Sequence, residues 1–181
     1  MEATGGPEVL NFTDVEVPRP GAGELLVKVS ATGVNYIETY QREGIYPMSL
    51  PYTPGSEGAG EVVEVGEGVE DFSVGDYVAT AAGVGLYAEH AIVAQDSAVP
   101  VNVTLVEARV AAAAMLQGMT AHYLTHSTFP LKEGDTMLIH AAAGASACSC
   151  ARWRRCSGRG LSEPPGARRR RSSQEGPGRT R

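Results

Sequence analysis

Apolar and polar residues alternate in short stretches over the first hundred residues, and glycine or proline separates most of these stretches. The alternation predicts strands over residues 9–17, 24–33, 61–65, 72–80 and 86–93. Residues 34–43 are expected to form a short helix, and Gly44 supplies a residue suited to its C-terminal end. Short strands at this spacing favour a compact, barrel-like β domain.

The pattern changes after this β domain. Residues 106–116 are rich in alanine and favour a helix, Gly118 interrupts the helical pattern, and residues 120–126 resume it. Residues 137–139 then form a short apolar run, which predicts a strand of a parallel sheet that is buried on both faces. Small residues and Gly144 follow, so the layout is that of a substrate domain leading into a nucleotide-binding domain.

Charge divides the chain into two opposite parts. Residues 1–150 hold 19 of the 21 acidic residues but only five of the 15 basic ones, whereas residues 151–181 hold ten arginines and two glutamates. This last part has one Leu, one Trp and no Ile, Val or Phe, so it cannot bury enough apolar surface to offset chain entropy and is expected to be disordered.

The simplest interpretation of this tail is out-of-frame sequence after Gly144. Nucleic-acid binding through its arginines, with Trp153 stacking on a base, is the alternative. We favour a solvated tail with no nucleic-acid partner because no nucleic-acid-binding fold is indicated.

Candidate metal ligands are few. Cys148, Cys150 and Cys156 lack the paired C-x-x-C spacing of a structural zinc site, so no metal role is expected for them. His122 and His126 stand four residues apart on a predicted helix, but no glutamate follows His122, and packed or solvated histidines are expected.

No apolar run approaches the ~18 residues of a membrane helix. The N-terminus lacks a basic region followed by an apolar stretch, so we expect a cytoplasmic protein without a membrane partner.

Several blocks of sequence occur in the order of a known family. They are Val9-Leu10, Gly33-Val34-Asn35, Thr39-Tyr40, the run from Pro54 to Gly60, Val74-Gly75-Asp76, the run from Leu116 to Tyr123 and the run from His140 to Gly144. Together they resemble the zinc-free quinone oxidoreductase (zeta-crystallin-like) branch of the medium-chain dehydrogenase/reductase superfamily, over about residues 5–144. The resemblance implies a mainly β fold with α: a GroES-like β-barrel domain over residues 1–104, then the helix and first strand of a Rossmann NADP-binding domain over residues 105–147. An Arg-rich, disordered tail would occupy residues 148–181.

The resemblance also implies hydride transfer from NADPH to a quinone or enone, without a metal, with the cofactor supplying the chemistry. Asn35 matches the amide that faces the nicotinamide and the substrate, and Tyr40 matches a tyrosine near the cofactor. Thr120 matches a threonine of the nicotinamide pocket, and Gly144 matches the first glycine of the pyrophosphate turn. Without the resemblance, Asn35 reads as a turn residue, Tyr40 as a core or surface residue and Thr120 as helix packing.

This sequence departs from the family pattern directly after Gly144, and it also lacks the ligands of zinc-dependent relatives. Residues 145–147 read Ala-Ser-Ala instead of Gly-Val-Gly, and their β-carbons would crowd a phosphate, so weak NADPH binding is expected. Zinc-dependent relatives carry a histidine where Ser56 stands and a cysteine near Gly33, so three strong zinc ligands are not assembled and no zinc is expected. The sequence thus predicts a truncated, impaired quinone oxidoreductase and leaves its activity open. A non-catalytic GroES-like binding or dimerisation module, which a homodimer would fit, is the alternative.

Overall fold

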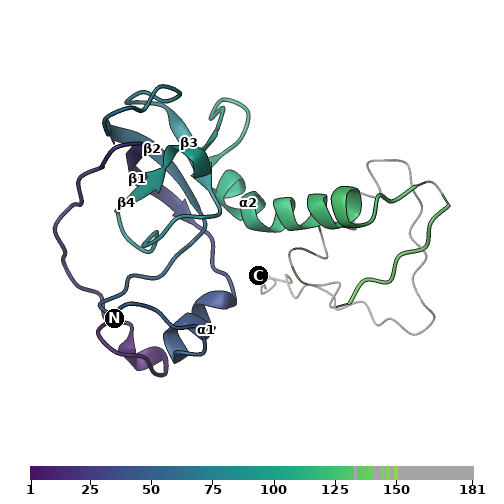
Figure 1. Ribbon diagram of the computed structural model, residues 1–181, viewed down its shortest axis with the longest axis horizontal. Coiled ribbons are helices and arrows are strands. Elements are labelled where there is room, and N and C mark those ends of the chain that lie inside the picture. Colours follow the sequence, from purple (N-terminus) through teal and green to yellow (C-terminus); the bar gives the residue numbers. More distant parts are fainter. Residues whose placement is uncertain (133, 141–143, 145, 147–148, 151–181) are drawn as a thin grey trace, which may run out of the picture. The chain divides into compact units, whose positions relative to one another are not determined.

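The computed structural model of the protein describes residues 1–132, 134–140, 144, 146, 149 and 150. The chain divides into two compact units, Met1–Met119 and Thr120–Arg181. The regular elements follow one another along the chain as 3-10 helix η1 (Pro7–Val9), β1 (Glu24–Thr32), α1 (Ile37–Glu43), β2 (Gly58–Val65), β3 (Tyr77–Thr80), β4 (His90–Ala94), 3-10 helix η2 (Gln95–Ser97), β5 (Val99–Pro100), α2 (Ala108–Tyr123) and π-helix η3 (Leu124–Thr128) (Figure 1).

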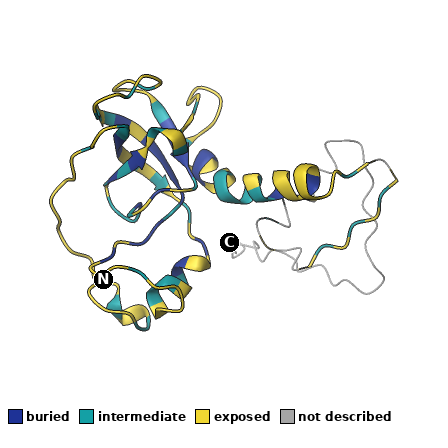
Figure 2. Cartoon of the chain, viewed as in Figure 1, coloured by how far each residue is buried: buried dark blue, intermediate teal, exposed yellow. Residues whose placement is uncertain are grey.

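The first unit is built on an antiparallel sheet of five strands in the order β4-β1-β2-β3-β5. β1 pairs with β2 on one side and β4 on the other, which places Leu25 between Val65 and Val93. Alternate residues of a strand share one face, and the shared face here forms the main core. Its buried members are Leu25, Val27, Val62, Val78 and Val93 (Figure 2). β1 is thus an inner strand of the sheet with partners on both edges, and it leads into the segment that holds Asn35.

A second buried cluster joins the first turns of α2 to the sheet. It consists of Ala59 in β2, Ala79 in β3, and Ala111 and Ala112 in α2. Alanine side chains let a helix backbone approach a sheet closely, and large residues at these positions would force the layers apart. The alanine run that predicted the helix thus also sets how near α2 lies to β2.

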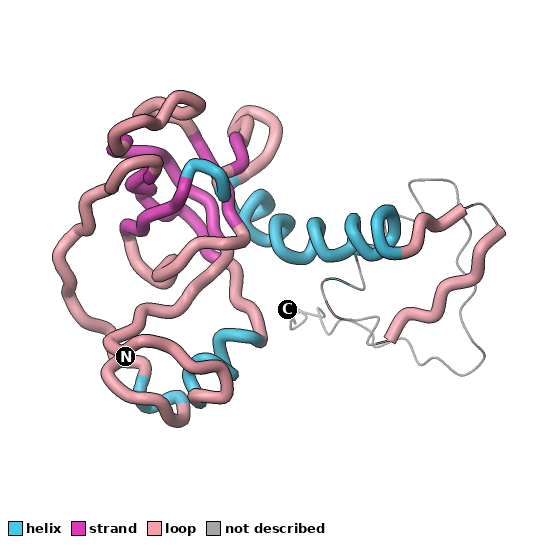
Figure 3. Tube along the Cα trace, in the orientation of Figure 1, coloured by secondary structure: helices cyan, strands magenta, loops and turns pink. Residues whose placement is uncertain are grey.

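Most predicted elements of the first unit are confirmed, but the strand predicted over residues 9–17 is wrong. Helix α1 ends at Gly44 with φ 79°, as the sequence indicated. Residues 10–20 have no regular structure (Figure 3). Phe12 in this segment is fully exposed. An alternating segment becomes a strand only when a neighbouring strand accepts its backbone hydrogen bonds. The described part of the chain offers residues 10–17 no such neighbour.

Two predictions near the C-terminal side of the described residues are also wrong. Gly118 does not interrupt α2, because a glycine costs about 1 kcal/mol relative to alanine in a helix and packing outweighs that cost. Residues 136–139 form no strand, and Leu138 is 72% exposed. A parallel strand needs neighbours on its edges, and none pairs with it among the described residues.

The predicted fold class, mainly β with α, is confirmed: a five-stranded β domain is followed by the helical start of a second unit. The disorder predicted for residues 148–181 falls outside the described residues, apart from Ser149 and Cys150. Within the described part of the chain, no helix has both the length and the apolar character required to cross a membrane.

Candidate functional site

Asn35 lies in the short link between β1 and α1, and only 7% of this residue is exposed. Its amide nitrogen Nδ2 donates to Oε2 of Glu57 at 2.9 Å. Its amide oxygen Oδ1 accepts from Nε2 of Gln117 at 2.6 Å. Its backbone N–H donates to Oε2 of Glu38 at 2.7 Å. One residue therefore joins the end of β1 to α1, to the start of β2 and to α2.

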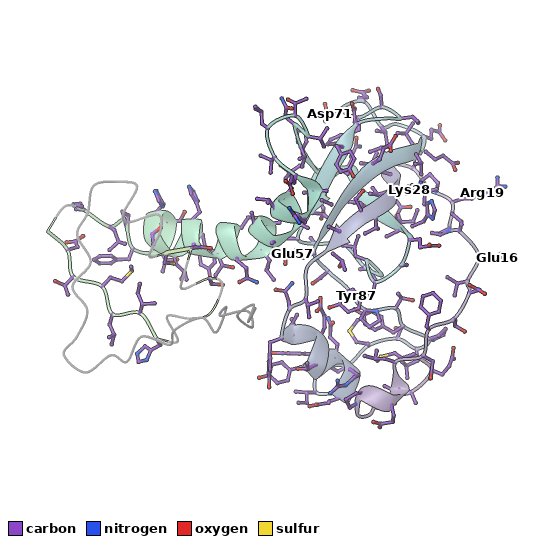
Figure 4. All side chains as sticks on the ribbon, turned by 180° about the vertical axis from the view of Figure 1, so that it is seen from behind. Glu16, Arg19, Lys28, Glu57, Asp71 and Tyr87 are labelled. Atoms are coloured by element: carbon purple, nitrogen blue, oxygen red, sulfur yellow. The ribbon has the colours of Figure 1, made fainter. Side chains whose placement is uncertain are left out.

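Glu57 is the most buried charged residue of this network, with 2% of its surface exposed. Its Oε1 accepts the backbone N–H of Leu116, in the middle of α2, at 2.7 Å. Its carbonyl oxygen accepts the N–H of Gly33 at 2.8 Å and the hydroxyl of Thr32 at 2.9 Å. Gly33 also makes room for the carboxylate, since a β-carbon there would lie 2.1 Å from Oε2 of Glu57. Figure 4 labels Glu57 where the strands and α2 meet.

Glu38 of α1 carries the second buried carboxylate. The phenol of Tyr87 donates to its Oε2 at 2.5 Å, and both the N–H and the hydroxyl of Ser56 donate to its Oε1 at 3.3 Å (Figure 4 labels Tyr87). Burial, followed by the hydrogen bond to Glu38, raises the pKa of Tyr87. Burial and the nearby charge of Glu38 likewise raise the pKa of Tyr52. Both phenols therefore stay protonated at neutral pH, and Tyr87 keeps its hydrogen-bond donor.

The two buried carboxylates are held by neutral donors. The ion pairs within the described ranges are Arg42 with Glu43 at 2.8 Å and Arg109 with Glu107 at 2.6 Å, both on other side chains. A buried carboxylate is tolerated when several N–H and O–H groups point at it. Among the described residues, no group of three His, Cys, Asp or Glu side chains is placed to hold a metal ion. The site is therefore a hydrogen-bonded frame around Asn35.

Three tyrosines form an exposed aromatic surface on and beside α1. Tyr36, Tyr40 and Tyr46 are 73%, 37% and 50% exposed. The Tyr36 and Tyr40 rings meet edge to face with centroids 5.2 Å apart, and the Tyr40 and Tyr46 rings do so at 5.9 Å. Exposed phenol rings can stack on a flat ligand and hydrogen-bond its edge. This surface adjoins the chain segment that holds Asn35.

Comparisons with known proteins show which proteins this chain is similar to. The sequence profile of the alcohol dehydrogenase GroES-like domain matches residues 21–103. A quinone oxidoreductase of Pseudomonas aeruginosa is 44% identical over 158 residues, which are 86% of this chain and 48% of the relative. A probable quinone oxidoreductase of Schizosaccharomyces pombe is 43% identical over 145 residues, 80% of this chain and 44% of the relative.

Solved structures agree with these relatives. A mycobacterial protein complexed with NADPH superposes with a TM-score of 0.84 and 44% identity, over 88% of this chain and 50% of that chain. The Escherichia coli quinone oxidoreductase complexed with NADPH gives a TM-score of 0.84 and 36% identity, over 88% of this chain and 49% of that one. Residues 21–103 therefore match an alcohol dehydrogenase GroES-like domain, and the similar proteins found by both comparisons include quinone oxidoreductases of the medium-chain dehydrogenase/reductases. The chain spans about half the length of the relatives it matches.

The four residues of this chain that were predicted to bind the cofactor lie in different parts of the sequence. Asn35 and Tyr40 belong to the first unit and stand five positions apart. Thr120 is a half-buried residue of α2 in the second unit, and Gly144 is exposed between positions that lie outside the described residues. Their roles toward a cofactor stay predictions.

The sequence did not single out Glu57, Glu38, Tyr87 or Gln117. The hydrogen-bonded pairs of the frame are 22 positions apart for Asn35 and Glu57, 49 for Tyr87 and Glu38, and 82 for Gln117 and Asn35. No local pattern reveals such pairs. The one available signal was an acidic residue, Glu57, within a block of small residues that had to pack closely.

Other residues considered as metal ligands or nucleophiles are accounted for by their surroundings. The rings of His122 and His126 stack with centroids 4.4 Å apart and planes 4° apart, so their in-plane lone pairs do not converge on one ion. Nδ1 of His126 lies 2.9 Å from the hydroxyl of Thr125. Cys150 is buried, and burial raises the pKa of its thiol, which makes it a weak nucleophile at neutral pH.

Proposed function

We propose that this chain provides the substrate-side part of an NADPH-dependent quinone oxidoreductase, which transfers a hydride to a quinone or enone. The observation that supports this best is the buried Asn35 frame beside an exposed tyrosine surface, in a fold shared with proteins solved with NADPH. Bound NADPH would supply the hydride, and a quinone that takes up the hydride and one proton becomes a hydroquinone.

The first unit fits the nicotinamide end of such a cofactor. A carboxamide side chain has two hydrogens to donate and two lone pairs. Asn35 uses one of each on Glu57 and Gln117, which leaves one hydrogen and one lone pair for a ligand. The free hydrogen and the free lone pair of Asn35 could bond the oxygen and the N–H of the nicotinamide carboxamide. The free N–H could alternatively donate to a quinone carbonyl. Tyr40 would hold a flat ring against its exposed face.

In the second unit, taken by itself, Thr120 and Gly144 are the residues that we propose for cofactor contacts. Gly118 stands next to this part of α2, and among the described residues no atom outside the neighbouring helix backbone lies within 4 Å of the position its β-carbon would take. A ligand could therefore approach the helix backbone there closely. Gly144 would take the phosphate end, where the absence of a side chain allows close approach. We expect the crowding residues after Gly144 to keep the affinity low.

The experiment is a titration of the full chain with NADPH, followed by the fluorescence of the nicotinamide. We expect saturable binding that weakens at least about tenfold in Tyr40→Ala and stays unchanged in Glu107→Gln, whose side chain is 65% exposed and lies outside the Asn35 frame. Oxidation of the bound NADPH on addition of a quinone would establish the reaction. No binding by the folded chain at millimolar NADPH would refute the proposal and leave a GroES-like binding or dimerisation module.

A further inference from the structure

The carboxamide of Asn35 is held at both ends by groups of opposite hydrogen-bonding character. An ionised carboxylate only accepts hydrogen bonds, so Glu57 requires the Nδ2 end of Asn35 to face it. Gln117 donates its Nε2 hydrogen to the Oδ1 end on the other side, which completes this orientation. Turning the Asn35 amide by half a turn would place an oxygen against the carboxylate and a hydrogen against the Gln117 hydrogen. Because Glu57 can only accept there, it allows a single orientation of Asn35, and Gln117 bonds the other end of the amide in that orientation.

Glu57 cannot adapt to a turned Asn35, because its own position is fixed. Its other carboxylate oxygen accepts the N–H of Leu116, and its carbonyl oxygen accepts hydrogen bonds from Gly33 and Thr32. The carboxylate also fills the space that a side chain at position 33 would need. The orientation of Asn35 is thus set by the fold, through α2 and the end of β1.

We propose that Glu57 and Gln117 are positioning residues that fix the polarity of the Asn35 carboxamide, so that its free N–H and its free oxygen face a ligand in one order. This rests on the proposed function, in which Asn35 contacts the nicotinamide or the quinone. A ligand carboxamide binds when its oxygen faces the free N–H of Asn35 and its N–H faces the free oxygen. When the Asn35 amide is turned over, the ligand N–H faces another N–H and the ligand oxygen faces another oxygen. With 7% of Asn35 exposed, its orientation decides which atom the ligand reaches.

The test exchanges the two neighbours while keeping their size, in the variant Glu57→Gln with Gln117→Glu. In this double variant the acceptor-only carboxylate stands at position 117, and the amide at position 57 can donate to Asn35 while its oxygen still accepts from Leu116. Asn35 then turns over with all its bonds remade. We expect the melting temperature to stay within a few degrees of the natural chain, whereas NADPH affinity falls at least about tenfold.

The single variants provide the controls. Gln117→Glu alone places a carboxylate at each end of Asn35, and we expect it to lower the melting temperature clearly. Glu57→Gln alone is isosteric, and it permits Asn35 and Gln117 to turn together, so affinity should fall without loss of fold. Should the double variant not fold, this single variant carries the test. A merely structural role for the pair predicts that the folded variants bind NADPH as well as the natural chain, and that result would overturn the proposal.

A second readout is independent of ligand binding. In an NMR experiment on the natural chain, the side-chain amide protons of Asn35 should show through-space contacts to the methylene protons of Glu57. In the double variant, these contacts should move to the side chain at position 117. Unchanged contacts would refute the turning of the amide. If the natural chain fails to bind NADPH, the proposed function fails, and these NMR contacts still decide whether the two neighbours set the orientation.

Discussion

Replacing Gly33 by alanine is expected to destabilise the chain by displacing the carboxylate of Glu57. The added β-carbon would lie 2.1 Å from Oε2, 2.7 Å from Cδ and 2.9 Å from Cγ of Glu57, far inside van der Waals contact. The carboxylate must then leave Asn35 or Leu116, or both. A hydrogen bond to a charged group contributes about 1.5–3 kcal/mol, and the lower entropy of the unfolded chain offsets about 0.4–1 kcal/mol. We therefore expect the free energy of unfolding to fall by about 3 kcal/mol.

Urea denaturation followed by far-ultraviolet circular dichroism measures this loss, and a double-mutant cycle assigns it to the clash. Glu57→Ala removes the atoms that the new β-carbon meets, so Gly33→Ala should cost close to nothing in that background. A thermal melt should show the single variant lower by about 10–20 °C. If Gly33→Ala costs the same with and without the Glu57 side chain, the clash with that carboxylate is not the cause and the reasoning fails.

Three further predictions concern the same unit and its helix. Gly118→Ala should raise the free energy of unfolding by about 0.5–1 kcal/mol, because a helical position with open space around it gains from alanine; a lower value in urea denaturation would contradict this. Ala112→Leu should lower it by about 1–3 kcal/mol, because this residue is 1% exposed within the cluster that joins α2 to the sheet; an unchanged midpoint would show that the layers are loosely packed. The raised pKa of Tyr87 makes the free energy of unfolding depend on pH. The contribution of this phenol is fully present below the ordinary tyrosine pKa of about 10 and is lost as pH rises further. The unfolded chain releases its proton first there, at a slope of at most about 1.4 kcal/mol per pH unit for one phenol. Tyr87→Phe should reduce the fall seen in denaturation curves above pH 10, and an unchanged slope would exclude this phenol as its source.

Local sequence patterns predicted the elements that pair with a neighbour in the same unit. β1 and β2 follow their apolar runs because each strand has partners on both edges. Residues 10–17 and 136–139 carry equally clear patterns and form no strand. The pattern records which face could be buried, but a strand also requires a partner for its backbone, which a single segment cannot specify.

The candidate site was predicted less completely than the fold. Asn35 was predicted as a site residue from a family resemblance. The residues that hydrogen-bond to its side chain were not predicted from the sequence. Glu57 and Gln117 reach Asn35 across 22 and 82 positions, after the sheet and α2 have brought them together. Which charged residue becomes buried depends on that tertiary packing, so no local rule identifies it.

The three-residue arrangement of Glu57, Asn35 and Gln117 also restricts how this protein can evolve. A substitution at one position either leaves its neighbours with mismatched donors or acceptors or turns the Asn35 amide over, so single changes should be selected against. An alignment of many relatives should therefore show these three positions either invariant or altered jointly. The exchange of acid and amide between positions 57 and 117 is a joint alteration that keeps both bonds of the Asn35 amide. In lineages that carry it, the free N–H and the free oxygen of Asn35 should face the ligand in the opposite order.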